Sequence, residues 1–359
     1  MNTHDILMAH ARFSRRHLLV SSSALALASQ SAQSQITFGR TIRVAMIGWE
    51  GHPGEITGPL PRLPEVRIIA ASGVPPGRLK GARLYPDYRH MLDREKPDIV
   101  AVTNNNGERA QAILEAARRG FNIIAEKPLA INRKDYEQVK QTVLDNKIRL
   151  GMLLPMRFDS PYRLLRQVVE QGLIGEVGQI GAQKSYVAGD RPPWFLDKRT
   201  YGSTILWIGI HMFDLMLFTS GRDFRAVASF AARVGQPELK DMQNVTATLL
   251  RLDNGGVATL RMDYFRPATA GSHGDDRLRL AGTRGIVEYQ PSLGVVLMND
   301  LGPPEKLTRL PERGSVFVDY LEWLYKGTSP GLTMEEIWRA NEVTLAAHEA
   351  AEQGRILQI

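Results

Sequence analysis

The first half of the chain alternates short apolar runs with a segment in which apolar residues recur at helical spacing. Four runs are typical of strands buried on both faces, at residues 42–48, 66–72, 98–103 and 121–125. Between the last two runs, residues 108–119 place four apolar side chains on one face of a helix that ends at Gly120. This alternation predicts an α/β fold with a parallel, doubly wound sheet.

The pattern changes after residue 177. Residues 244–249 and 257–262 alternate at a period of two and flank the turn 253–256, which is typical of an antiparallel sheet with one covered face. A last helix is predicted over 333–353. We therefore expect two domains, at residues 40–155 and 156–359, the second of them an α+β domain with a large, mostly antiparallel sheet.

The first residues carry a separate signal. Arg15 and Arg16 precede the mild apolar run 20–28, a pattern that predicts a twin-arginine export signal at 1–28 and a linker at 29–39. A membrane span needs about 20 apolar residues, so we expect no membrane anchor after cleavage and a periplasmic or otherwise exported protein. An uncleaved amphipathic start with a chance arginine pair is the alternative.

Charge and cysteine content exclude several classes. The 359 residues carry a net charge of +7, and the first 28 hold three arginines against Asp5, which leaves +5 for the rest. A moderate excess without a basic run argues against a nucleic-acid partner. Because the chain has no cysteine, it has no disulfide and no thiolate nucleophile.

The most informative stretch is 121–128, where an apolar strand ends in Glu126-Lys127-Pro128. Pro128 lacks a backbone donor and favours an extended conformation at Lys127, so the strand stops there. Lys127 then lies at the carboxyl end of a strand, the edge where ligands bind in open α/β sheets. An ordinary solvated loop lysine is the alternative for the tripeptide taken alone.

A glycine loop follows the first strand at the same edge. Gly48, Gly51 and Gly54 have the spacing G-x-x-G-x-x-G, one residue longer than the dinucleotide fingerprint, and a plain glycine turn is the alternative. The second strand ends in Ser72, with Arg78 nearby and no acid for the ribose hydroxyls. This favours NADP over NAD, or the absence of a nucleotide at this place.

Several motifs in register resemble the glucose-fructose oxidoreductase/inositol dehydrogenase/MocA family. They are the glycine loop, Thr103-Asn104-Asn105, Glu126-Lys127-Pro128, the G-x-I-G-x-V step at 172–177, the G-x-H-x-x-D segment at 209–214 and the G-T-x-G turn at 282–285. The resemblance implies a nicotinamide-binding Rossmann domain, followed by a sheet domain that shapes a sugar or polyol pocket. It also implies a homo-oligomer, because the sheet face often pairs subunits in this family.

The resemblance assigns roles to individual residues. His211 is the expected acid/base, with a histidine that only packs in the core as the alternative, and Lys127 is expected to polarise the same oxygen and to hold the nicotinamide end. Asp214 could orient His211 or face another partner. Substrate contacts are expected from Lys127, Arg157, His211 and Asp214. Cofactor contacts are expected from Gly48, Gly51, Gly54, Ser72, Arg78, Thr103, Asn104, Asn105, Glu126 and Lys127.

Two departures from the family pattern affect the site. Trp207 stands where many relatives carry an acid, and the segment 104–108 lacks a histidine that relatives often have. Asp197, Lys198, Arg199 and Tyr201 are candidates to replace the missing acid. No cluster has metal-ligand spacing, so no metal site is expected.

These observations predict an oxidoreductase that acts on a sugar or polyol with NADP or NAD. Outside the cytoplasm little free cofactor is available for exchange, so we expect tight binding and recycling in place. Two alternatives stay open: an NAD-dependent glycoside hydrolase of the same family, and a non-catalytic carbohydrate-binding relative.

Overall fold

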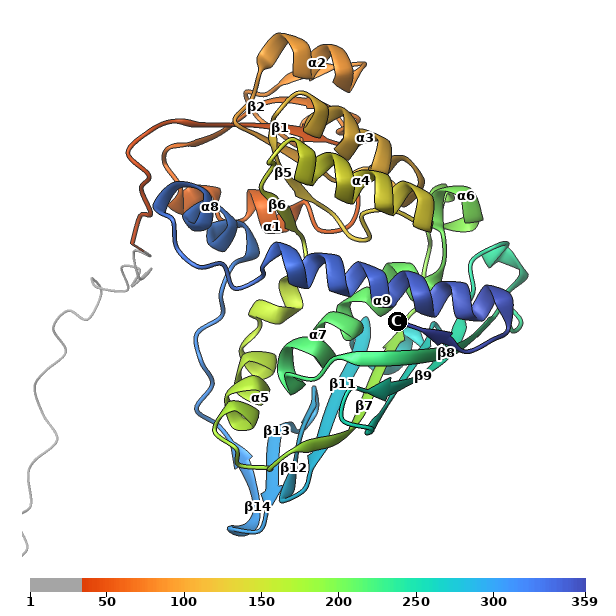
Figure 1. Cartoon of the computed structure of the whole chain (residues 1–359). Coiled ribbons are helices and arrows are strands. Elements are labelled where there is room, and N and C mark those ends of the chain that lie inside the picture. Colours follow the sequence, from red (N-terminus) through yellow and green to blue (C-terminus); the bar gives the residue numbers. More distant parts are fainter. Residues whose placement is uncertain (1–33) are drawn as a thin grey trace, which may run out of the picture. The chain divides into compact units, whose positions relative to one another are not determined.

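The computed structural model of the protein describes residues 34–359 (Figure 1). The predicted export signal at 1–28 and the first part of the predicted linker 29–39 lie outside the described residues, so both stay predictions.

The first domain contains a six-stranded sheet in which all neighbouring strands are parallel, in the order β3-β2-β1-β4-β5-β6. The strands are β1 (Ile42–Ile47), β2 (Val66–Ser72), β3 (Arg83–Tyr85), β4 (Ile99–Val102), β5 (Asn122–Ala125) and β6 (Leu150–Met152). The connecting helices are α1 (Gly54–Thr57), α2 (Tyr88–Glu95), α3 (Asn106–Arg118) and α4 (Arg133–Asp145). This is the predicted doubly wound parallel sheet, and its four predicted strands are confirmed.

The second domain contains a nine-stranded sheet in the order β14-β13-β12-β11-β7-β10-β9-β8-β15. The strands are β7 (Val177–Tyr186), β8 (Phe224–Ala232), β9 (Val245–Leu252), β10 (Val257–Asp263), β11 (Gly274–Gly282), β12 (Gly285–Gln290), β13 (Gly294–Asn299), β14 (Gly302–Leu307) and β15 (Leu357–Gln358). Every neighbouring pair is antiparallel except β7 and β10. Helices α5 (Ser160–Glu170) and α7 (Ile210–Ser220) lie against one face (Figure 1), so the predicted sheet with one covered face is confirmed.

The carboxyl-terminal helices connect the two sheets. Helix α8 (Val316–Lys326) and the start of α9 (Met334–Gln353) contribute Phe317, Tyr320 and Trp338 to the core around the first sheet. The later turns of α9 pack on the second sheet, so α9 runs between the two sheets (Figure 1). The boundary at 155 stays a prediction, and the structure adds that the end of the chain returns to the first domain.

One helical stretch among the described residues, Lys198–Ser220, is long and apolar enough to cross a membrane by length and composition alone. It contains α6 (Lys198–Tyr201), a π-helical turn η4 (Ile205–Gly209) and α7. Because 89% of its most apolar window is buried inside the protein, it is a core helix of the second domain. Its π-helical turn lies beside the site described next, where such turns often occur in proteins.

Candidate active site

The carboxyl ends of β1, β4 and β5 meet at one edge of the first sheet. The amide of Thr103 donates to the carbonyl of Ile47 at 2.7 Å, and its hydroxyl donates to the carbonyl of Gly48 at 2.8 Å. Gly48 has a φ of +82°, and a Cβ there would lie 2.4 Å from Cα of Asn104. Only glycine allows this close approach of two chain segments. The predicted cofactor residues after β1, β4 and β5 are therefore neighbours.

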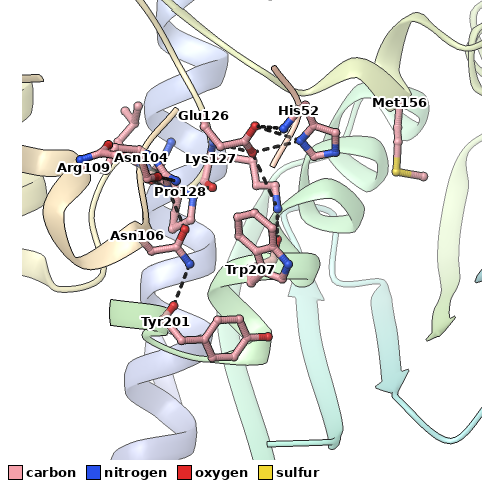
Figure 2. Close-up of polar contacts among 12 residues, drawn as sticks. His52, Asn104, Asn106, Arg109, Glu126, Lys127, Pro128, Met156, Tyr201 and Trp207 are labelled. Carbon is pink, nitrogen blue, oxygen red and sulfur yellow. Dashed lines mark hydrogen bonds and ion pairs between the residues drawn. The ribbon is translucent and has the colours of Figure 1, made fainter. Parts of the chain in front are cut away.

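A buried arginine from α3, which the sequence analysis did not single out, holds this edge together. Arg109 is fully buried and donates to the carbonyls of Lys127 and Pro128, both at 2.9 Å, and to the side chain of Asn106 (Figure 2). Burial lowers the pKa of Arg109 to about 10, although Glu126 and Glu50 oppose the shift. Arg109 therefore stays charged at neutral pH and fixes the Lys127-Pro128 peptide, which is cis.

The carboxylate of Glu126 is fully buried beneath the glycine loop. It accepts hydrogen bonds from the amides of His52 at 2.8 Å and Lys127 at 3.0 Å, and Nδ1 of His52 lies 3.0 Å away (Figure 2). Burial alone would raise the pKa of this carboxyl, but His52, then Lys127 and Arg109, outweigh it and lower the pKa to about 2. Glu126 is therefore an anion at every pH at which the protein is expected to work.

Replacing Glu126 with Gln is expected to destabilise the fold by an amount that depends on pH. The carboxyl has a pKa of about 2 in the fold against 4.5 in the unfolded chain, so its contribution, on the order of 3 kcal/mol, is present above pH 4.5. It is lost as the pH falls from 4.5 towards 2. Urea unfolding of wild type and Glu126→Gln at pH 7, 4.5 and 3 should show a gap that narrows below pH 4.5. The exposed control Glu305→Gln should show little difference at any of these pH values, and a constant gap for Glu126→Gln would contradict the assignment.

Lys127 packs against Trp207 of the π-helical turn. Its ammonium donates to the carbonyl of Trp207 at 2.6 Å, lies 3.1 Å from the centre of the indole ring and is 3.8 Å from Oε1 of Glu126 (Figure 2). Burial lowers the pKa of Lys127 well below its usual value, with Glu126 opposing. The tryptophan that replaces the family's acid therefore covers the lysine with a carbonyl and an aromatic face.

His211 lies one helical turn after Trp207 and reaches a cleft of about 630 Å³. The cleft is lined from both domains, by His52 of the first and by residues of the second that include Met156, Asp159, Tyr186, His211, His273, Asp276 and Arg313. Lys127 does not line it and is only 1% exposed, so its predicted contact with substrate stays a prediction. Nδ1 of His211 is buried and has no hydrogen-bond partner among residues 34–359. Buried polar atoms without a partner are uncommon, and a catalytic role is among the explanations for them.

The electrostatic surroundings keep the His211 ring neutral. Burial lowers its pKa well below the usual 6.5, and the charges of Lys127, Lys184 and His52 lower it further. A neutral imidazole can accept a proton from a substrate hydroxyl at neutral pH.

The structure places Arg157 and Asp214, two of the predicted substrate contacts, away from the cleft. The two side chains are 2% and 1% exposed and form an ion pair at 2.5 Å, and Arg157 also pairs with Glu336 at 2.6 Å. Neither residue lines the cleft, and Asp214 makes no bond to His211. The pair instead fixes η2 (Pro155–Phe158) against α7, because each charge satisfies the other in a buried place.

The cleft is also lined by Tyr186 and Asp276, which the sequence analysis did not identify, and the buried Lys184 lies behind them. Lys184 on β7 and Asp276 on β11 are direct cross-strand neighbours, with Nζ 3.0 Å from Oδ2, and the hydroxyl of Tyr186 donates to the same oxygen at 3.1 Å. The other oxygen of Asp276, Oδ1, is buried without a partner among the described residues. Lys184 and Tyr186 are two residues apart on β7, a spacing that puts both side chains on one face of the sheet. This spacing is the sequence pattern from which the two residues could have been identified.

Some of the remaining predicted residues lie at the carboxyl edge of the first sheet, and others lie away from it. Ser72 is buried at the end of β2, whereas Arg78 is exposed in the loop that follows. Asn105 caps α3 through the amide of Glu108 at 3.1 Å. The candidates to replace the missing acid lie away from the cleft, because Asp197 caps α6 and pairs with Arg199, and Tyr201 is buried against Thr204.

The edge fits a nicotinamide dinucleotide. Oδ1 of Asn104 is buried without a partner within residues 34–359, and the amide of Gly51 donates to no acceptor in that range. The amide of His52 already donates to Glu126, and α1 is a single helical turn. A pyrophosphate would therefore bind to backbone amides of the glycine loop and not to the N-terminus of a long helix. In the described part of the chain, no three His, Asp or Glu side chains form a group that could hold a metal ion.

A doubly wound sheet of this order, joined to an antiparallel sheet domain with a buried imidazole in the cleft, defines a two-domain nucleotide-binding oxidoreductase. The chain belongs to the GFO/IDH/MocA family: residues 42–153 match the family described as oxidoreductase family, NAD-binding Rossmann fold, and residues 162–288 match the GFO/IDH/MocA C-terminal domain. The resemblance inferred from the sequence motifs is thereby confirmed.

Curated relatives are similar to this chain over part of their length. The uncharacterized oxidoreductase YrbE of Bacillus subtilis is 25% identical over 62% of this chain and 66% of its own length. The myo-inositol 2-dehydrogenase of Thermotoga maritima is 24% identical over 57% and 60%, and the D-glucoside 3-dehydrogenase of Escherichia coli is 32% identical over 42% and 43%. The matches thus span two thirds or less of these relatives.

Solved structures match over most of this chain. A Thermotoga maritima structure described as an oxidoreductase is 29% identical, with a TM-score of 0.83 over 89% of this chain and all of its own. The aldose-aldose oxidoreductase of Caulobacter crescentus, at 22% identity and a TM-score of 0.75, covers 89% of this chain and all of its own, and it shows the shared fold.

Proposed function

We propose that the protein is an NAD(P)-dependent oxidoreductase that interconverts a CH–OH group of a sugar or polyol and the corresponding carbonyl group, in the cleft between its two domains. The observation that carries this proposal is the neutral, buried His211 at a cleft that Asp276 also lines; Nδ1 of His211 and Oδ1 of Asp276 both lack a partner within residues 34–359. The similarity to inositol and glucoside dehydrogenases supports the substrate class.

The chain's own residues would act as follows. His211 accepts the proton of the substrate hydroxyl, and Asp276 accepts a hydrogen bond from another hydroxyl of the same ring. When bound, a nicotinamide dinucleotide would supply the acceptor for the hydride that leaves the substrate carbon. Gly48, Gly51 and Asn104 would hold it at the edge of the first sheet. Lys127, covered by Trp207, lies close enough to His211 for its charged form to lower the pKa of that imidazole.

We also propose that the protein is exported and that it binds its cofactor tightly. A protein that works where free nucleotide is scarce would retain it and recycle it between two carbohydrates. Denaturing the purified protein should then release NADP or NAD, which absorbance and mass spectrometry of the supernatant would identify. Adding myo-inositol or methyl glucoside to the native protein should reduce the bound nucleotide. A protein that carries no nucleotide and binds none on titration would be the non-catalytic alternative.

Asp276→Asn is expected to raise KM for the sugar or polyol by about 10-fold or more while kcat changes less. The carboxylate is held by Lys184 and Tyr186 and lends its free oxygen to the substrate, and a lost charge-assisted bond is worth about 1.5–3 kcal/mol. Steady-state kinetics of Asp276→Asn and of the exposed Asp300→Asn measure the effect. An unchanged KM for Asp276→Asn would place the substrate elsewhere.

We also propose that the open face of the nine-stranded sheet pairs two copies of the chain. This face carries a shallow groove of about 570 Å³, in which Phe230 is 75% and Leu249 is 53% exposed. Sedimentation velocity should show a dimer for wild type and a monomer for Phe230→Glu. The matched variant Leu301→Glu, at a residue that is 69% exposed beside β14, should leave the dimer intact. A wild-type monomer would contradict the proposal.

A further inference from the structure

The histidine of the glycine loop lies beside His211 at the same cleft. The two rings are edge to face with centres 5.2 Å apart, and both His52 and His211 line the cleft. The side chain of His52 is 31% exposed, whereas His211 is 5% exposed. His52 therefore connects the buried imidazole to solvent.

Glu126 fixes the orientation of His52. Its fully buried carboxylate binds both the amide of His52 and Nδ1, so Nδ1 carries a proton and the other ring nitrogen is left as an acceptor. This carboxylate–imidazole arrangement has the geometry in which a carboxylate fixes the tautomer and the orientation of a proton-accepting imidazole. A glycine loop with a purely structural role would not need a carboxylate that holds the ring of His52.

His211 needs a route for its proton. A positive charge on His211 is disfavoured by burial and by the nearby charges of Lys127 and Lys184. A positive charge on His52, in contrast, lies 3.0 Å from the carboxylate of Glu126. His52 therefore offers the proton a ring nitrogen on an imidazole held by a carboxylate, which is a partner that His211 lacks among the described residues.

We propose that His52, held by Glu126, is a proton-relay residue that carries protons between His211 and solvent. The proton leaves the His211 nitrogen as a bond to the free nitrogen of His52 forms, through one bridging water or hydroxyl, and no electrons move in this step. The inference rests on the proposed function, because His211 must first receive a proton from the substrate.

His52→Asn tests the relay. The amide of asparagine replaces Nδ1–H as a donor to Glu126, so the loop keeps its contact, but no group is left to accept a proton. We expect kcat to fall by about 10-fold or more, and we expect added imidazole buffer to restore it while wild type responds little to the buffer. The matched variant His90→Gln, at an exposed residue of α2, should keep full activity.

A second readout does not depend on turnover. Nitrogen-15 NMR of protein labelled at the histidine ring nitrogens should show, at pH 8, that the His52 ring is protonated on Nδ1 only. The His52 signal is assigned by its loss in His52→Asn. A proton on Nε2 of His52 in place of Nδ1 would overturn the relay. Full turnover of His52→Asn, or a loss of kcat that imidazole does not restore, would overturn it as well. A wild-type protein that oxidises neither myo-inositol nor methyl glucoside would instead remove the proposed function, and the relay with it.

Discussion

His211→Gln is expected to lower kcat/KM by about 10²–10⁴-fold, the usual contribution of a general acid–base group. Glutamine fills similar space and keeps a polar group at the cleft, but it cannot accept a proton. Steady-state assays with myo-inositol or methyl glucoside and the matched control His90→Gln measure the effect. A His211→Gln variant within about 3-fold of wild type would remove His211 from the mechanism.

The pH profile gives an independent check of the same residue. Because burial and nearby cations lower the pKa of His211 well below 6.5, the ring stays neutral as the pH falls through that value. The kcat/KM of wild type should therefore stay nearly flat from pH 8 to pH 6 and fall only at lower pH. A loss of activity centred near pH 6.5 would mean that an ordinary, solvated histidine is the base.

Arg157→Met is expected to destabilise the protein by about 3–5 kcal/mol, because it leaves the buried carboxylate of Asp214 without its partner. Burial already raises the pKa of Asp214, and Arg157 is the group that opposes this shift. Urea unfolding at pH 7 measures the difference. The double variant Arg157→Met/Asp214→Leu should recover much of the loss, since it removes both charges from the core.

The matched control for this experiment is the exposed pair Arg284–Asp300, whose side chains are 51% and 52% exposed. Arg284→Met should change stability by less than about 1 kcal/mol. An Arg157→Met variant as stable as Arg284→Met would show that the buried pair does not hold η2 against α7.

The sequence predicted the architecture well where burial alone decides the pattern. The apolar runs of β1, β2, β4 and β5 are covered on both faces, so hydrophobic residues mark almost their whole length. The hairpin of β9 and β10 alternates because one face is covered. The long helix α9 was predicted within one residue at its start, because Thr333 and Glu336 form a capping box there.

The candidate site was predicted less completely, because its contacts join residues far apart in the chain. The motif around His211 placed that residue correctly at a cleft. Arg157 and Asp214, however, are 57 residues apart, and nothing in the sequence shows that each is the other's partner. Lys184 and Asp276 meet only through the register of β7 and β11. The role of Trp207 depends on a π-helical turn that the sequence pattern does not reveal.

A crystal structure of the protein with NADP or NAD and myo-inositol bound would show whether the substrate reacts at His211. We expect a substrate hydroxyl within about 2.6–3.2 Å of a ring nitrogen of His211, and the adjacent carbon within about 3–3.5 Å of the nicotinamide ring. Density for the polyol outside the cleft, or a nicotinamide ring that lies away from His211, would contradict this expectation.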